Sequence, residues 1–361
     1  MNIIPQLEKL HIYLTNKCNN QCLHCWVNAK PNKKSCLNYN DITKQIDKAI
    51  PLGLKIIKIT GGEPLLFQKT LEDILFYSFD KKLEIRLETN ASLITNEFVK
   101  KLSDFNINVY ASLDGSTSVT HDYFRDKNGS FRQTIKGIKK LVTHKINTEI
   151  ICCLYKNNIN ELNDIIQLVI QLGVQKLKFN FPSPYGRGEK LEKNMSLLSI
   201  KEILNVTSNI EKYYYKKNNL TIDIDIPRAL LKYPKNGKRC DVFNIISILP
   251  NGYVSLCGIG VTIRDFIFGH IEDNIDEIWK NNELLHKMRK QLSSGGQKIC
   301  QLCTEYNNCY AHCIAYSLTK YKSLNGPHPL CQNAFIEGLF PKKFIRQDKL
   351  IMSNLSKEIS C

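Results

Sequence analysis

The sequence lacks any apolar run near the 20 or so residues that a membrane span needs. It also lacks the apolar N-terminal segment of a signal peptide, because Pro5 and Glu8 interrupt that stretch. Acidic residues are scarce, with 34 Asp and Glu against 50 Lys and Arg. The first two absences argue against a membrane-spanning or secreted chain, and we expect a cytoplasmic protein.

The shortage of acidic residues leaves a net charge of +16, which favours anionic partners such as acidic peptides, nucleic acid or a membrane surface. The lysines are scattered over positions expected on exposed helix faces, as in residues 135–145. No basic run is interleaved with aromatic residues, so nucleic-acid binding is not expected. Hydrophobic residues at 43% and charged residues at 23% are ordinary for a compact globular protein.

Cysteine is abundant, with 14 residues in a chain that has no secretory signal. Because cytosolic thiols are kept reduced, a disulfide framework is not expected, and metal ligation is the leading interpretation. The distribution supports it, since three cysteines lie close together near the N-terminus and seven lie between positions 240 and 331.

The first half of the chain repeats a short β-branched strand followed by an amphipathic helix, the pattern of a parallel sheet with crossover helices. This pattern predicts an α/β fold, a (β/α)6 partial TIM barrel. Six strands are expected, at Lys9 to Thr15, Lys55 to Thr60, Leu83 to Thr89, Asn108 to Ser112, Glu149 to Tyr155 and Lys176 to Phe181.

The texture changes after Phe181, where Pro-Ser-Pro-Tyr-Gly-Arg-Gly predicts a loop and the end of the barrel. Asn251-Gly252 then predicts a tight hairpin turn in a C-terminal cysteine-rich region. The expected elements are a helical stretch from about Ser196 to Asn218, hairpin strands at Ile245 to Leu249 and Tyr253 to Cys257, and one helix from Ile275 to Leu292. The expected domains are a core at 1–190, a helical linker at 191–235, the cysteine-rich domain at 236–340 and a tail at 341–361.

Three cysteines form the pattern C-x3-C-x2-C directly after the first strand, and we call Cys18, Cys22 and Cys25 the barrel triplet. Three thiolates in a short loop can hold three irons of a cubane cluster and leave the fourth iron without a protein ligand. The alternatives are unrelated cysteines or a zinc site, although zinc normally takes four ligands, often from two cysteine pairs.

The residues C-N-N-Q-C-L-H-C from Cys18 to Cys25 resemble the signature of the radical S-adenosylmethionine (SAM) superfamily. Gly61-Gly62-Glu63-Pro64, after the second strand, resembles that family's GGEP motif. Both motifs follow strands at the carboxyl rim, where such sheets bind ligands. The resemblance continues in Glu88-Thr89-Asn90 and in Ser112-Leu113-Asp114-Gly115, and Arg125 follows at nearly the family's distance.

This resemblance implies that SAM chelates the open iron and that one-electron reduction cleaves it to a 5'-deoxyadenosyl radical. It places His24 beside the adenine, the motif from Gly61 to Pro64 on the amino group, and Ser112 and Arg125 near the carboxylate and ribose. The planar fork of an arginine suits a carboxylate. For Asn90 and Asp114, ordinary turn chemistry at strand ends is an equal alternative to ligand contact.

The seven C-terminal cysteines resemble the SPASM domain, which is found in radical SAM enzymes that mature peptides and sulfatases. The resemblance implies two auxiliary iron–sulfur clusters, expected to be of the 4Fe-4S type, and therefore three clusters in all. An outer quartet would ligate one cluster: Cys300, Cys303, Cys309 and Cys331. An inner trio would ligate the other: Cys240, Cys257 and Cys313. The alternative is a zinc ribbon.

The inner trio lacks a fourth cysteine, because the region after Cys240 reads Asp241-Val242-Phe243-Asn244-Ile245-Ile246. The fourth position is therefore expected to hold water, an oxygen ligand such as Asp241, or a substrate group. An open position would favour peptides that contain cysteine as substrates.

The SPASM resemblance implies post-translational modification of a peptide by a cross-link, a thioether or an epimerisation. Expected partners are an acidic leader peptide, an electron donor such as flavodoxin or ferredoxin, and a separate leader-binding protein, because Cys18 follows only a short first strand. Sulfatase maturation is the runner-up, weakened by Gly258 at the position of the proposed base. Redox chemistry on a sugar or another small molecule, and a cluster-binding protein without activity, are further alternatives.

Four cysteines remain outside these sets: Cys36, Cys152, Cys153 and Cys361. Cys152 and Cys153 are adjacent on the fifth strand, so alternation sends one side chain into the barrel. An inward thiol could return a hydrogen atom to a substrate radical, although a small buried apolar residue is the commoner role of such a cysteine.

Overall fold

The computed structural model describes residues 4–213, 220–232 and 240–346. It contains two compact units. Among the described residues, the first comprises 4–197, 220–222 and 243–282, and the second comprises 198–213, 223–232, 240–242 and 283–346. Residues 243–282, expected within the cysteine-rich domain, thus group with the barrel strands, and the domain boundaries remain predictions.

The first unit is built on a parallel sheet in which each strand of the barrel pairs with its neighbours in sequence. All six predicted strands are present, with ends within two residues of the expected positions. They are β1 (Lys9–Thr15), β2 (Ile56–Gly61), β3 (Glu84–Thr89), β4 (Ile107–Ser112), β5 (Asn147–Cys153) and β6 (Lys176–Asn180).

The predicted partial barrel of six strands is present, and four more strands extend its sheet. The sheet order is β10-β9-β8-β1-β2-β3-β4-β5-β6-β7, so it is an open sheet. β8 pairs parallel with β1, whereas β9 is antiparallel to both of its neighbours, β8 and β10. The added strands are β7 (Thr221–Ile224), β8 (Ile245–Ile248), β9 (Tyr253–Ser255) and β10 (Ile267–His270).

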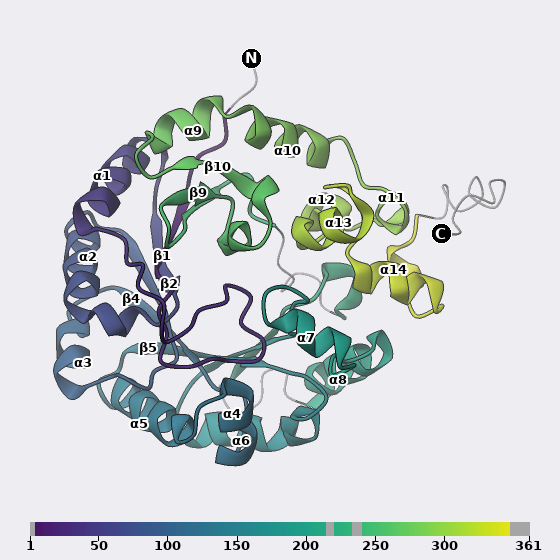
Figure 1. Cartoon of the computed structure of the whole chain (residues 1–361). Coiled ribbons are helices and arrows are strands. Elements are labelled where there is room, and N and C mark those ends of the chain that lie inside the picture. The colour runs from purple at the N-terminus through teal and green to yellow at the C-terminus, as the bar shows by residue number, and fades with distance from the viewer. Residues whose placement is uncertain (1–3, 214–219, 233–239, 347–361) are drawn as a thin grey trace. The chain divides into compact units, whose positions relative to one another are not determined.

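Helices flank the barrel strands on the outside, as Figure 1 shows for α1 to α6. The helix-facing strand positions are apolar and buried, for example Ile57, Leu87, Val109 and Ile150. The helices of this unit are α1 (Tyr39–Ala49), α2 (Gln68–Asp80), α3 (Asn96–Leu102), α4 (Ser118–Arg125), α5 (Ser130–Thr143), α6 (Leu162–Gln171), α7 (Gly188–Lys193) and α9 (Ile275–Asn281).

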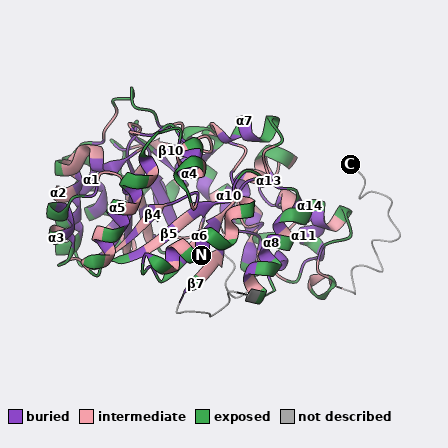
Figure 2. Ribbon diagram, turned by 90° about the horizontal axis from the view of Figure 1, so that it is seen from below, coloured by how far each residue is buried: buried purple, intermediate pink, exposed green. Residues whose placement is uncertain are grey.

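Burial follows the amphipathic pattern that defines these helices. Figure 2 shows buried strands in the interior and alternating buried and exposed positions along the helices. In α5, for example, Thr134, Ile138 and Leu141 are buried at spacings of three and four residues. No helix among the described residues is long and apolar enough to cross a membrane.

The second unit consists of helices around the outer quartet. They are α8 (Ile200–Tyr213), α10 (Glu283–Ser293), α11 (Ile299–Leu302), α12 (Tyr306–Cys309), α13 (Ile314–Tyr321) and α14 (Pro329–Ile336). α8 lies within the predicted stretch from Ser196 to Asn218, whose last residues lie outside the described part of the chain.

The single helix predicted from Ile275 to Leu292 is wrong, because Asn282 interrupts it. Its backbone is extended (φ −68°, ψ 116°), and its side-chain amide donates to the Phe268 carbonyl at 2.9 Å. An asparagine that bonds to backbone away from the helix favours a break over continuation. α9 and α10 therefore belong to different units.

Candidate functional site

The barrel triplet lies on the loop that follows β1, at the carboxyl end of the parallel strands. Backbone hydrogen bonds hold this loop at three places. Cys18 donates to the Lys30 carbonyl at 3.2 Å, and Leu23 donates to the Phe124 carbonyl of α4 at 2.9 Å. The backbone N–H of Arg187 donates to the Cys25 carbonyl at 3.0 Å. These three hydrogen bonds fix the backbone of the loop that carries the three thiols.

The two glycines of the GGEP motif allow β2 to approach the start of this loop. A Cβ atom at Gly61 would lie 2.5 Å from the Thr15 carbonyl oxygen, and one at Gly62 would lie 2.0 Å from the Lys17 carbonyl oxygen. Gly61 also has a φ of +129°, which glycine adopts without strain. The backbone N–H of Glu63 donates to the same Lys17 carbonyl at 2.8 Å. The motif therefore positions the backbone directly before Cys18.

The Glu63 carboxylate is fully buried and held by three donors. Oε1 accepts from the Thr89 hydroxyl at 2.7 Å and from the Leu65 N–H at 3.1 Å, and Oε2 accepts from the Asn90 N–H at 2.8 Å. Burial raises the pKa of Glu63, while these donors oppose the rise. Since a carboxylate offers about four acceptor sites, this one retains capacity for a further donor such as an amine.

Asn90 braces the loop as well as its own turn. Its amide nitrogen donates to Asn19 Oδ1 at 2.8 Å and lies 4.0 Å from the Cys18 sulfur, while its Oδ1 accepts from the Ser92 N–H at 2.9 Å. The backbone N–H of Asn20 also donates to the Cys18 sulfur at 3.4 Å. Donors that point at sulfur favour the thiolate, the form that binds metal.

Arg125 lies at the second cysteine of the triplet. Its Nη1 donates to the Cys22 sulfur at 3.7 Å, and its Nη2 lies 2.6 Å from Asp114 Oδ2. Burial pushes the pKa of Asp114 upward, but the Arg125 guanidinium holds it below its usual range. Asp114, which the sequence left between turn chemistry and ligand contact, thus lies beside the triplet as the partner of Arg125.

Three aromatic rings stack beside the triplet. The His24 ring lies on Phe124 with ring centroids 4.4 Å apart, and Phe124 lies on Tyr155 at 4.2 Å. Ser112 ends β4 in register with Ile151 of β5. The stack brings the predicted His24 together with two residues that the motifs did not indicate.

Several buried polar atoms around the triplet have no hydrogen-bond partner within the described part of the chain. They are both atoms of the Asn20 amide, His24 Nδ1, Arg125 Nε and the Tyr155 hydroxyl. A buried polar group without a partner is costly. Buried polar atoms without partners on this loop and on neighbouring segments fit a site that is completed by a polar ligand, as the SAM assignment requires.

Arg187 is a site residue that the sequence did not single out. Its Nε donates to the Cys22 carbonyl at 2.7 Å and its Nη1 to the Ala29 carbonyl at 2.8 Å. Gly186 beside it packs so closely that a Cβ atom would lie 2.7 Å from the Cys25 carbonyl oxygen. The sequence signal for this contact was the Pro and Gly content of the predicted loop that contains Arg187. A loop rich in glycine can pack closely against another backbone segment.

Burial governs the ionisation of Cys18 and Cys22. Burial, and then the nearby Glu63 carboxylate and Cys22, raises the pKa of Cys18 to about 12. Burial also raises the pKa of Cys22, which the Arg125 guanidinium opposes. Thiols that ionise reluctantly become thiolates when a metal binds, with release of protons. The donor set therefore fits an iron cluster, whose positive irons compensate the buried negative charges.

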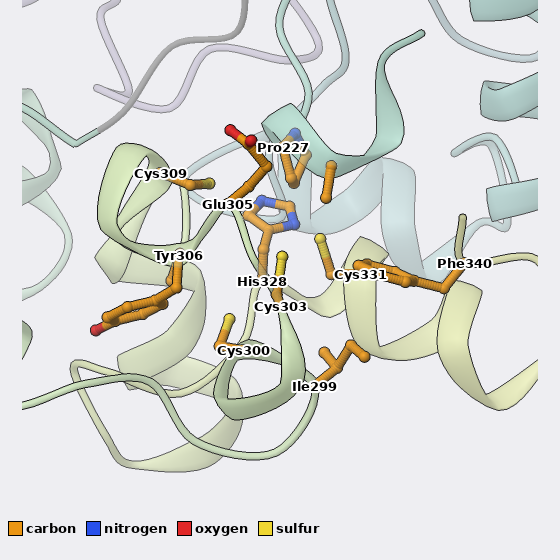
Figure 3. A pocket seen from close by; sticks show the side chains of 12 residues that line it. Pro227, Ile299, Cys300, Cys303, Glu305, Tyr306, Cys309, His328, Cys331 and Phe340 are labelled. Atoms are coloured by element: carbon orange, nitrogen blue, oxygen red, sulfur yellow. The ribbon is translucent and has the colours of Figure 1, made fainter. Parts of the chain in front are cut away.

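The outer quartet lines one cavity of the second unit, together with Glu305, Tyr306 and His328. In Figure 3 the four sulfur atoms point into the space between them. Burial and the charges of Cys300, Cys309 and Cys303 raise the pKa of Cys331. Four converging thiols of this kind match the ligand set of a 4Fe-4S cluster.

The inner trio is divided between the units, with Cys257 in the first and Cys240 and Cys313 in the second. Beside Cys257, a Cβ atom at Gly258 would lie 2.4 Å from the Tyr13 hydroxyl oxygen. A side chain at position 258 would therefore require the buried Tyr13 ring to move. The ligand roles of the inner trio, including that of Asp241, remain predictions.

Among the spare cysteines, the structure distinguishes Cys153 from Cys152. Cys153 packs with Phe124, Tyr155 and Leu191 beside the triplet, and its N–H donates to Asp114 Oδ1 at 2.7 Å. Cys152 points to the opposite face of β5 and is fully buried. Cys36 lies in an isolated bridge with Thr15, and Cys361 lies outside the described residues.

An open α/β sheet with three thiols on the loop after its first strand defines a class of iron–sulfur enzymes. Residues 12–169 match the model of the radical SAM superfamily, and residues 240–310 match that of the SPASM iron-sulfur cluster-binding domain. The chain therefore carries a radical SAM domain at residues 12–169 and a SPASM domain at residues 240–310. Members of the first family bind SAM and a 4Fe-4S cluster, and SPASM domains bind further iron–sulfur clusters.

Curated relatives and solved structures agree with this assignment. The chain is 28% identical over 283 residues to the antilisterial bacteriocin subtilosin biosynthesis protein AlbA of Bacillus subtilis. This alignment covers 76% of this chain and 60% of AlbA, so the chain spans less than two thirds of that relative's length. It is 27% identical to the AdoMet-dependent heme synthase of Methanosarcina barkeri, covering 88% and 94%. SuiB of Streptococcus suis bound to S-adenosylmethionine superposes with a TM-score of 0.75 at 17% identity, covering 91% and 78%.

Proposed function

We propose that this enzyme cleaves SAM reductively to a 5'-deoxyadenosyl radical and uses it to modify a peptide by a cross-link, a thioether or an epimerisation. The observation that carries the proposal is the barrel triplet on a loop held by backbone hydrogen bonds, with buried polar atoms that lack partners on the same loop and on the neighbouring Arg125. Of the relatives, AlbA is named for bacteriocin biosynthesis, and SuiB has been solved with its precursor peptide SuiA.

The proposed SAM site uses the residues that surround the triplet. Glu63 is held with acceptor capacity to spare and suits the amino group, while Arg125 Nε is the unpartnered donor that suits the carboxylate. The Nδ1 atom of His24, which has no partner among the described residues, suits the adenine. The backbone of the site is shaped by Gly61, Gly62 and Pro64. The remaining proposed residues of the SAM site, at the carboxyl ends of β3 and β4, are Asn90 and Ser112. When bound, the cluster supplies the electron that cleaves the sulfonium.

Two auxiliary clusters are part of the proposal, one on the outer quartet and one on the inner trio. The shared cavity supports the outer assignment. The inner cluster has three proposed thiolates and a fourth position for Asp241, water or a substrate thiolate. Cysteines without disulfides throughout the described residues suit the cytoplasm. There, a flavodoxin or ferredoxin would donate electrons, and a separate protein would present the leader.

A second candidate is radical chemistry on an iron tetrapyrrole or another small molecule, favoured by the alignment that covers 94% of a heme synthase. Sulfatase maturation is less favoured, because Tyr13 occupies the space that an acidic side chain at position 258 would need.

The test is incubation of the iron-reconstituted enzyme with SAM, dithionite and synthetic peptides copied from short reading frames beside its gene. A cross-link or thioether removes two hydrogen atoms from the peptide, and an epimerisation in D2O adds one deuterium, both visible by mass spectrometry. A parallel reaction contains an iron coproporphyrin. Conversion of the porphyrin with no change in any peptide would overturn the peptide assignment in favour of the second candidate.

A further inference from the structure

Arg125 connects a cluster ligand to a buried carboxylate through two arms of one guanidinium. Nη1 donates to the Cys22 sulfur at 3.7 Å, and Nη2 lies 2.6 Å from Asp114 Oδ2. The side chains of Arg125 and Asp114 are only 8% and 1% exposed. The proposed contact with SAM uses Nε, which has no partner among the described residues. That contact therefore does not account for the interactions of Nη1 and Nη2.

Asp114 is itself fixed on all sides. Its Oδ1 accepts from the Cys153 N–H at 2.7 Å, and its backbone N–H donates to His121 Nδ1 at 3.1 Å. The Asn158 amide donates to the Asp114 carbonyl at 2.9 Å and to the Cys153 carbonyl at 2.8 Å. A carboxylate anchored in this way holds the guanidinium in one orientation, with Nη1 on the sulfur.

A permanent positive charge at this distance changes the energy of the site's redox states. An arginine stays protonated in proteins, so its charge is constant. Reduction adds one electron beside Cys22, and a cation in a poorly solvated position stabilises the more negative state. Hydrogen bonds to cluster sulfurs and local net charge are established determinants of cluster potentials in general. The anchoring carboxylate opposes part of this effect because it carries the opposite charge.

We infer that Asp114 and Arg125 form a positioning pair that sets the reduction potential of the cluster on the barrel triplet. Arg125 makes the cluster easier to reduce, and Asp114 both aims the guanidinium and limits that gain. The inference rests on the proposed function, since it requires Cys22 to be an iron ligand. It assigns Arg125 a role in the reduction step besides its proposed contact with SAM.

The test is a redox titration of the full-length holoprotein followed by electron paramagnetic resonance, using the signal that is lost when the triplet is replaced by alanine. Arg125→Gln should lower the ratio of reduced to oxidised cluster about tenfold at a fixed ambient potential, about 59 mV for one electron. Asp114→Asn should shift the ratio in the opposite direction. Arg125→Lys keeps the charge and should restore most of the loss.

Arg187→Gln is the matched control, because Arg187 contacts the same loop through the Cys22 and Ala29 carbonyls and not through sulfur. Iron content is measured for every variant, and Arg125→Lys and Asp114→Asn decide the outcome if Arg125→Gln fails to load iron. Three results would overturn the inference. The first is an unchanged potential in iron-replete Arg125→Gln, and the second is an equal shift in Arg125→Gln and Arg187→Gln. The third is a shift of the same sign in Arg125→Gln and Asp114→Asn. Deoxyadenosine formation by the wild type tests the proposed function separately.

Discussion

Replacement of Gly62 by alanine tests whether the GGEP motif positions the cluster loop. The added Cβ atom would lie 2.0 Å from the Lys17 carbonyl oxygen. Ordinary contact begins near 3.4 Å, so the two backbones must separate by about 1.4 Å. That separation disrupts the hydrogen bond from the Glu63 N–H to Lys17, which is 2.8 Å long. Overpacking of this kind costs about 1–3 kcal/mol of the free energy of unfolding.

The functional consequence should exceed the loss of stability, because Cys18 follows Lys17 directly. A displacement near 1 Å is enough to disturb a site that depends on aligned ligands. We expect Gly62→Ala to lose the barrel cluster, which is about a third of the bound iron if each of three clusters holds four irons. Deoxyadenosine formation should fall by about 100-fold or more.

Iron and sulfide assays, urea denaturation and chromatography of deoxyadenosine give the three readouts. Gly129→Ala is the control, because Gly129 has a φ of +79° and nothing within 4 Å of its added Cβ atom. It should lose about 1–2 kcal/mol of stability from the left-handed backbone while it keeps its iron. Full iron content and wild-type turnover in Gly62→Ala would refute the positioning role.

Three further outcomes follow from the site. Replacing any one cysteine of the outer quartet with alanine should remove auxiliary iron while SAM still binds to the barrel cluster. Iron analysis measures the first effect, and the change that SAM causes in the electron paramagnetic resonance signal measures the second. Unchanged iron content would contradict the assignment. If the reaction is an epimerisation, Cys153→Ala should stop deuterium uptake from D2O while deoxyadenosine still forms, and Cys152→Ala should not; full uptake in Cys153→Ala would return this thiol to a packing role. In the iron-free chain the pKa of the Cys18 thiol is about 12 when folded and about 8.5 when unfolded. The unfolded state therefore loses the thiol proton first as the pH rises, so the free energy of unfolding should fall between about pH 8.5 and about pH 12. The loaded protein should lack this slope in urea titrations, and equal slopes would argue against thiolate ligation.

Much of the barrel was predictable because buried positions repeat with period two throughout β3 and β4 and over part of the other barrel strands. The strand ends agree within two residues where the apolar alternation is clear, as from Lys9 to Thr15. β7 was not predicted, although Thr221 to Ile226 alternates polar and apolar residues, because a strand of four residues gives only a weak periodic signal. The pairing of β8 with β1 was not predictable, since it joins positions that are far apart in sequence.

The site was predictable where motifs are local and unpredictable where partners are distant. The barrel triplet and Glu63 were found from short patterns, and the structure places them side by side. Arg187 was missed because its role depends on a contact with the Cys22 carbonyl across 165 positions. The stack of Phe124 on Tyr155 likewise depends on how α4 packs against the end of β5.

The most direct test of the account is SAM cleavage by the reconstituted enzyme under strictly anaerobic conditions with dithionite. The wild type should produce 5'-deoxyadenosine, and the variant with alanine at Cys18, Cys22 and Cys25 should produce none while it retains the auxiliary iron. Deoxyadenosine formation by that variant, or no cleavage by a wild type with its full complement of iron, would contradict the assignment of the radical chemistry to the barrel triplet.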